Sequence, residues 1–203
     1  MRVLLVCVAI ALLSCPAELQ RRRRTVAEAF NDFQICRDLN ISAPETMLEV
    51  YYGNEEIKTG EEIYADITVE FPEVGFAVEP GCYYTFIIVD PDSPSAYDPF
   101  WRSYLMALYV NIGSSPSSLG GLDLHTGFEV ATHIPTSPIP GTGIHRYVLL
   151  LFKQPYGIST IDENLLCFQQ FRLNFRVDEF MCYYNLTGPV AGNFYLSQFP
   201  ERT

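Results

Sequence analysis

The sequence predicts a mainly β domain, a sandwich of sheets with short helices at its periphery. The chain has 203 residues, of which 48% are hydrophobic and 18% are charged, so it can bury a core. Dense apolar runs of strand length recur through its middle and are bounded by proline and glycine. Helix-start patterns lie towards the two ends of the region 25–203. Because no repeat or low-complexity tract divides that region, we expect one domain.

Residues 1–17 have the pattern of a secretory signal peptide. Arg2 precedes the apolar run 3–13, which is too short to span a bilayer. Small residues follow, and cleavage is expected after Ala17. A buried N-terminal helix or strand is the alternative. We therefore expect a secreted, extracellular protein without a transmembrane span.

Residues 18–24 form a basic linker that contains four adjacent arginines, Arg21–Arg24. Four neighbouring cations must be solvated. In a secreted chain such a segment is either a protease cleavage site or a linker that is never cut, and both interpretations stay open.

Three short helices are predicted around the strands. Residues 25–28 (Thr-Val-Ala-Glu) form a capping box that opens a helix through Phe33. A second capping-box pattern at 160–163 precedes a helix expected to reach Phe171. Residues 177–184 predict the third helix.

The strands are predicted from periodicity. Residues 63–71 alternate between apolar and polar, which indicates a strand with one wet face. Residues 47–52 are a further candidate that turns at Gly53-Asn54. Denser apolar runs predict central strands buried on both faces. They are residues 83–89, 104–112 and 147–152.

Cysteines and sequons agree with secretion. Two of the six cysteines, Cys7 and Cys15, fall in the signal peptide. An even number remains, which in an oxidising compartment predicts two disulfides, with three pairings open and four buried thiols as the alternative. These cysteines are Cys36, Cys82, Cys167 and Cys182. Asn40 and Asn185 begin Asn-x-Ser/Thr triplets and are candidate glycosylation sites, although such triplets also occur by chance.

The charge of the chain excludes some partners. Asp and Glu number 24 against 13 Lys and Arg, a formal net charge of −11. Without surplus cations the protein is not expected to bind nucleic acid through its phosphates, and it repels anionic bilayers. No cysteine or histidine spacing typical of a zinc site is present, so we expect no metal or other cofactor.

Polar chemistry is concentrated in two loops. The first, 90–94 (Asp-Pro-Asp-Ser-Pro), holds two carboxylates in a segment stiffened by two prolines. The second, 141–147 (Gly-Thr-Gly-Ile-His-Arg-Tyr), permits close backbone approach at its glycines and leads His145 into the next strand. If both loops lie at one rim of the sheet, they form a small polar pocket. The alternative is an ordinary turn and a core histidine.

Larger blocks of the sequence resemble a known family. The blocks YTFIIVDPDSPS, DPFWR, GTGIHRYVLLLF, FRVDEFMCYYNL and GPVAGNFY are similar, in order and spacing, to the phosphatidylethanolamine-binding protein family over roughly residues 26–199. That family includes the Raf kinase inhibitor protein and the plant flowering regulators. The resemblance implies a β-sandwich with an anion-binding pocket near one end. It implies binding of phosphate, acetate or phosphorylethanolamine, inhibition of kinases or proteases by several members, and no enzymatic activity.

The resemblance also implies roles for residues. Asp90, Asp92 and Pro94 occupy the DPDxP positions, and His145 and Tyr147 occupy the GxHRY positions. Asp90 and His145 would line the pocket from opposite sides. All five are therefore candidate ligand-binding residues.

Two positions depart from the family pattern, and one agrees with it. Met106 stands where the family usually has a second pocket histidine, and a thioether cannot donate a hydrogen bond to phosphate. Ser137 replaces the family's usual glycine before the GTG turn. Both are included among the candidate ligand-binding residues. Arg102 follows the Asp-Pro pair at 98–99 as in the family, and we expect it to hold the loop through an ion pair.

The sequence therefore predicts a secreted, non-enzymatic binding protein for a small phosphorylated or anionic ligand. In a zwitterion such as phosphorylethanolamine, the ammonium would face Asp90 and the phosphate would meet His145. The alternative is a secreted protease inhibitor or signalling protein whose loop surface binds a protease or a receptor. A hydrolase in which Asp90 or Asp92 polarises His145 has less support, because no GxSxG or HExxH motif is present.

Overall fold

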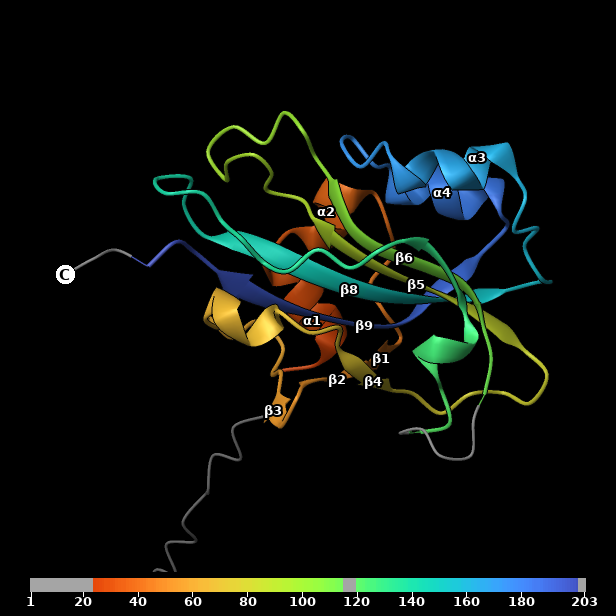
Figure 1. Cartoon of the computed structure of the whole chain (residues 1–203). Coiled ribbons are helices and arrows are strands. Elements are labelled where there is room, and N and C mark those ends of the chain that lie inside the picture. The colour runs from red at the N-terminus through yellow and green to blue at the C-terminus, as the bar shows by residue number, and fades with distance from the viewer. Residues whose placement is uncertain (1–23, 115–119, 201–203) are drawn as a thin grey trace, which may run out of the picture.

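The computed structural model of the protein describes residues 24–114 and 120–200, and its centre is a six-stranded mixed sheet (Figure 1). The strand order is β1-β9-β8-β5-β6-β7, with β1 parallel to β9 and every other neighbouring pair antiparallel. A three-stranded sheet has the order β3-β2-β4. The larger sheet comprises β1 (Thr46–Met47), β5 (Tyr83–Asp90), β6 (Tyr104–Ile112), β7 (Phe128–Ala131), β8 (His145–Gln154) and β9 (Thr187–Ser197). The smaller one comprises β2 (Glu49–Tyr52), β3 (Glu55–Glu56) and β4 (Glu73–Gly75).

Both faces of the large sheet are covered. Side chains alternate along a strand, so in β5 Ile87 and Val89 enter one apolar cluster while Phe86 and Ile88 enter the other. The first cluster includes residues of the helices, and the second includes residues of β2 and β4. Burial on both faces explains why β5, β6 and β8 read as dense apolar runs, and these three predicted strands are confirmed.

Helical structure is present where all three helices were predicted, and the middle one consists of a short α-helix continued by a 3-10 turn. The capping box is present at the start of α1, where Thr25 N donates to Glu28 Oε2 (2.8 Å) and Glu28 N donates to Thr25 Oγ1 (3.2 Å). The third predicted helix is α4. The helices are α1 (Val26–Asp32), α2 (Ile35–Leu39), α3 (Glu163–Leu166) and α4 (Val177–Tyr183), with short 3-10 turns η1 (Ala65–Thr68), η2 (Leu124–Thr126) and η3 (Cys167–Gln169).

Two local predictions were wrong. Residues 63–71 form no strand; the turn η1 occupies their middle, because the Thr68 hydroxyl donates to Ala65 O (2.8 Å) and closes the backbone on itself. The second capping box is also absent. The cap of α3 is Asp162, whose carboxylate accepts from Asn164 N (2.9 Å), so the helix starts later and is only four residues long.

The four cysteines of the expected disulfides are free thiols in this structure, so it contains neither disulfide. They lie on different elements, and the Cys167 thiol instead donates to Asn164 O (3.0 Å). Asn40 and Asn185 are both exposed, with φ of 54° and 50°, just after α2 and α4.

The predicted signal peptide and all of the basic linker except Arg24 lie outside the described residues. Across residues 24–114 and 120–200, no helix has the length and hydrophobicity needed to cross a bilayer.

Candidate functional site

Asp90 and His145 meet where two neighbouring strands end. Asp90 is the last residue of β5 and His145 is the first of β8, and because these strands are antiparallel the two positions are adjacent. His145 Nδ1 lies 2.8 Å from Asp90 Oδ2. Both residues are buried, 3% and 6% exposed. The two polar loops therefore meet in the fold, and the ligand pocket predicted between them stays a prediction.

Thr142, inside the glycine turn, contacts the other side of the imidazole. His145 Nε2 lies 2.9 Å from Thr142 Oγ1, and that hydroxyl donates to Ile139 O (2.7 Å). A hydroxyl has one hydrogen, so Nε2 is the donor in its contact with Thr142. Nδ1 donates to the carboxylate of Asp90. Both ring nitrogens of His145 therefore have a hydrogen-bond partner.

The order carboxylate, imidazole, hydroxyl is also that of a nucleophilic triad. In a triad the imidazole accepts the proton of the hydroxyl, whereas here the Thr142 proton is directed to Ile139 O. The hydrogen bonds thus do not arrange Thr142 as a nucleophile for which His145 is the base. Within the described part of the chain, no three His, Cys, Asp or Glu side chains are grouped as metal ligands.

Asp92 is directed away from this pair. Its carboxylate accepts hydrogen bonds from Arg146 N (2.9 Å), Nε (2.8 Å) and Nη2 (2.6 Å). Successive residues of a strand point to opposite faces, so Arg146 draws Asp92 to the face opposite His145. The structure therefore places Asp92, a predicted ligand-binding residue, in a structural ion pair.

The ion pair extends to Arg102 and Asp38. Arg102 lies 3.3 Å from Asp38 and 3.5 Å from Asp92, and its Nε donates to Pro91 O (2.6 Å), so its predicted role in holding the loop is confirmed. Arg146 Nη2 also donates to Asp38 (2.8 Å). Burial raises the pKa of Asp38, but hydrogen bonds from Arg146 and Arg37 and the charges of the arginines lower it more, so the net pKa lies below its ordinary value.

Stacked tyrosines lie beside the Asp90–His145 pair. The ring of Tyr147 stacks on Tyr195, with centroids 5.3 Å apart, and lies 6.3 Å from the His145 ring. Tyr195 OH lies 2.7 Å from Thr136 Oγ1. Burial and the charge of Asp90 raise the pKa of Tyr147, and burial raises the pKa of Tyr195 to about 12. Both phenols are therefore neutral near pH 7.

The other predicted ligand-binding residues have varied surroundings. Met106 is buried in the apolar cluster that also contains Tyr147 and Tyr195. Pro94 is partly exposed, and Ser137 is exposed. Sequence reasoning missed Thr142, although it lies three residues before His145 within the glycine turn. It also missed Tyr195, the last residue of the block GPVAGNFY.

Exposed apolar side chains lie on the segments around the two polar loops and on the chain after β9. Tyr97 is 81% exposed and lies over Gly143, where an added Cβ would be 3.1 Å from the Tyr97 ring. A groove of about 530 Å³ runs beside it. We call the exposed residues Tyr97, Phe100, Ile139, Ile144 and Phe199 the apolar rim.

Comparisons with known proteins agree with this geometry. The chain is 33% identical to a 26 kDa secreted antigen of Toxocara canis over 159 residues, which are 77% of this chain and 58% of that protein. It is 27% identical to the putative odorant-binding protein A5 of Drosophila melanogaster, over 92% of this chain and 87% of that protein. The fold matches a carboxypeptidase Y inhibitor, solved in complex with its cognate proteinase, with a TM-score of 0.71 and 20% identity over 86% of this chain and 95% of that one.

The family model for the phosphatidylethanolamine-binding protein matches residues 44–195. That range includes both polar loops, the Asp90–His145 pair and the stacked tyrosines. The chain belongs to the phosphatidylethanolamine-binding protein family.

Proposed function

We propose that this protein is a non-enzymatic binding protein for a small phosphorylated or zwitterionic ligand, held at the Asp90–His145 pair. The observation that supports this most directly is the hydrogen bond from His145 Nε2 to Thr142 Oγ1 (2.9 Å). The Thr142 oxygen stands where a ligand oxygen would accept a hydrogen bond from the imidazole. A phosphate oxygen carries more negative charge than a hydroxyl and accepts a stronger hydrogen bond.

Ligand entry requires Thr142 to move. Thr142 lies between Gly141 and Gly143, whose φ values of 77° and 82° are accessible mainly to glycine. The Asp90 carboxylate already accepts from His145 and from Asp92 N (2.8 Å), so only its remaining lone pairs can receive a ligand ammonium. The anionic group of the ligand is therefore expected to supply most of the affinity.

Calorimetric titration with phosphorylethanolamine tests this function, with ethanolamine and inorganic phosphate as part-ligands. We expect phosphorylethanolamine and phosphate to bind, ethanolamine to bind weakly, and His145→Gln to abolish binding. Met106→His should tighten binding about tenfold or more, since a hydrogen bond to a charged group contributes roughly 1.5–3 kcal/mol. Phosphate binding that survives His145→Gln unchanged would refute the proposed site. An unchanged affinity in Met106→His would remove Met106 from it.

The protein is proposed to act outside the cell. A relative named as a secreted antigen and another named as a putative odorant-binding protein support this location. The predicted signal peptide agrees with it. The direct check is to express the full-length chain in cells and to measure the mass of the protein recovered from the medium. We expect a mass that lacks residues 1–17.

Inhibition of a protease is the second candidate function. The apolar rim supports it, because three of its members, Tyr97, Ile139 and Phe199, line one groove, and exposed apolar patches are typical of protein contact surfaces. The acidic chain also suits a basic partner. Residual peptide hydrolysis by extracellular proteases, measured with and without this protein, is the test. Tyr97→Ser with Ile139→Ser should abolish inhibition while phosphorylethanolamine binding persists; inhibition that survives both changes excludes the rim.

A further inference from the structure

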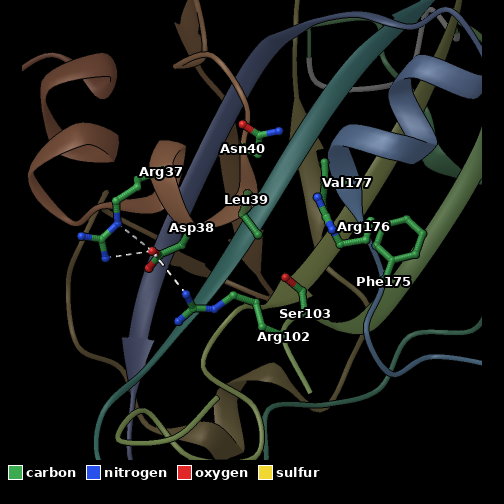
Figure 2. Close-up of a pocket in the computed structure, with 9 residues that line it drawn as sticks. All are labelled: Arg37, Asp38, Leu39, Asn40, Arg102, Ser103, Phe175, Arg176 and Val177. Atoms are coloured by element: carbon green, nitrogen blue, oxygen red, sulfur yellow. Dashed lines mark hydrogen bonds and ion pairs between the residues drawn. The ribbon is translucent and has the colours of Figure 1, made fainter. Parts of the chain in front are cut away.

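Figure 2 shows a further pocket, of about 410 Å³, whose lining includes Asp38 and Arg102 from the ion-pair network of Asp92 and Arg146. Three segments meet there: α2, the residues just before β6, and the start of α4. We call it the arginine pocket. It is lined by Arg37, Asp38, Leu39, Asn40, Arg102, Ser103, Phe175, Arg176 and Val177.

The charged residues that line this pocket are three arginines and one aspartate. Each of these arginines is also ion-paired: Arg37 with Asp38, Arg102 with Asp38 and Asp92, and Arg176 with Asp178 and Glu179. The side chains of Arg37 and Arg176 are 70% and 53% exposed, whereas the side chain of Asp38 is 6% exposed. Arg37 and Arg176 are therefore accessible to a ligand. The anion of the lining, Asp38, is largely covered, whereas Glu179 beside Arg176 is 70% exposed.

The arginines keep hydrogen-bond donors for a ligand. Arg37 uses Nε and Nη2 on Asp38, and among the described residues no protein acceptor contacts its Nη1. Arg176 uses Nε and Nη2 on Asp178, and its Nη1 lies 3.4 Å from Glu179 Oε1; neither acidic residue lines the pocket. Because a guanidinium has five N–H groups, each arginine retains donors.

Ion pairs hold the side chains beneath these donors in place. Asp38 is held by Arg102 (3.3 Å) and by Arg146 (2.8 Å), so the floor of the pocket is part of the same ion-pair network that stiffens the DPDSP loop. Figure 2 shows Arg37 and Arg176 on opposite sides of the pocket, with the Ser103 hydroxyl directed into it. A ligand between the two arginines would meet positive charge on both sides.

We propose that the arginine pocket binds a phosphate or sulfate group of a small molecule or glycan. Guanidinium groups match the geometry of tetrahedral oxyanions and form paired hydrogen bonds with them. The pocket is independent of the Asp90–His145 site, since Arg146 and His145 point to opposite faces of β8. The protein thus has two anion sites at one end of the sheet.

Calorimetric titration with inorganic sulfate and inorganic phosphate, at constant ionic strength, tests the second site. Arg37→Gln with Arg176→Gln should weaken sulfate binding at least tenfold. Both side chains are largely exposed, so the fold should persist, and circular dichroism checks this. Lys153→Gln is the matched control, because it removes one cation elsewhere on the surface and should leave binding unchanged.

Sulfate titration of the His145→Gln variant distinguishes failure of this proposal from failure of the proposed function. In His145→Gln, sulfate binding should persist with unchanged affinity, and the Arg37 and Arg176 Nε–H resonances should still shift on addition of sulfate. Loss of sulfate binding in His145→Gln would assign the ion to the first site and overturn the proposal. Absence of sulfate and phosphate binding by the wild-type protein, or equal affinity in the double arginine variant, would overturn it as well.

Discussion

Arg146 and Asp92 form a bidentate ion pair, in which Nε donates to Oδ2 (2.8 Å) and Nη2 donates to Oδ1 (2.6 Å). Because of this ion pair, the two aspartates of the DPDSP loop have different roles. Asp92 anchors the loop to β8, and Asp90 is left to hold His145. The arginine pocket and the Asp90–His145 site are both built on this frame.

Asp92→Asn should lower the free energy of unfolding by about 1.5–3 kcal/mol, because the buried Arg146 keeps Asp38 but loses its bidentate charged partner. The side chains of Asp92 and Arg146 are largely buried, 5% and 13% exposed. Urea denaturation measures the change. Asp98→Asn is the control, since Asp98 is exposed in the same loop and should change stability by less than about 0.5 kcal/mol. Equal stability of the two variants would contradict the structural role of Asp92.

Thr142→Ala should tighten the binding of phosphorylethanolamine. The change removes the hydroxyl that competes with the ligand for His145 Nε2 and leaves room for a ligand oxygen. It should also cost about 1 kcal/mol of stability through the lost hydrogen bonds. Titration calorimetry measures the affinity, and Thr142→Ser, which keeps the hydroxyl, should bind as the wild type does. Weaker binding by the alanine variant would show that Thr142 contacts the ligand directly.

His133 should make the fold sensitive to mild acid. Burial lowers its pKa, and this effect exceeds the opposing hydrogen bond to Thr68 O (3.0 Å). Its Nδ1 is buried without a partner among the described residues. Between the ordinary histidine pKa of about 6.5 and the lower folded value, the unfolded chain binds more protons. The stability contributed by neutral His133 is therefore lost progressively as the pH falls below about 6.5.

Thermal unfolding of the wild type and of His133→Gln, compared between pH 7.5 and 5, isolates this contribution. Glutamine keeps an N–H donor for Thr68 O but does not titrate. The contributions of the other histidines cancel in the difference. The variant should lose less stability than the wild type on acidification, and parallel pH profiles would show that His133 is not responsible.

Gly192→Ala should destabilise the protein by roughly 1–3 kcal/mol through overpacking. An added Cβ would lie 2.5 Å from Pro44 Cγ and 3.0 Å from Phe30 Cζ, so β9 passes too close to the N-terminal segment for a side chain. Gly113→Ala is the matched control, because its Cβ would meet only Thr126 Oγ1 at 3.6 Å. Denaturation midpoints measure the stability of the two variants, and similar midpoints would refute the close-packing argument.

Several elements were predictable because their signals are local. The capping box of α1 and the apolar runs of β5, β6 and β8 depend on neighbouring residues alone. By contrast β9, the longest strand, was not predicted. Its sequence, TGPVAGNFYLS, contains two glycines and a proline, and it becomes a strand by pairing with β8 and with β1. Residues 63–71 had the period of a strand, but pairing with β9 is limited to the isolated bridge of Glu62, in which Ile63 N donates to Leu196 O (2.9 Å).

The amino-acid sequence alone determined the mainly β class, the family resemblance and the two loops in which the polar chemistry is concentrated, because these properties follow from composition, short-range order and motif spacing. The tertiary structure decided which of Asp90 and Asp92 meets His145, that Thr142 caps the imidazole, and that Arg37, Arg102 and Arg176 surround one pocket. Those relationships join residues distant in the chain. They depend on the register of β5 against β8 and on how α2 and α4 pack, which local sequence does not specify.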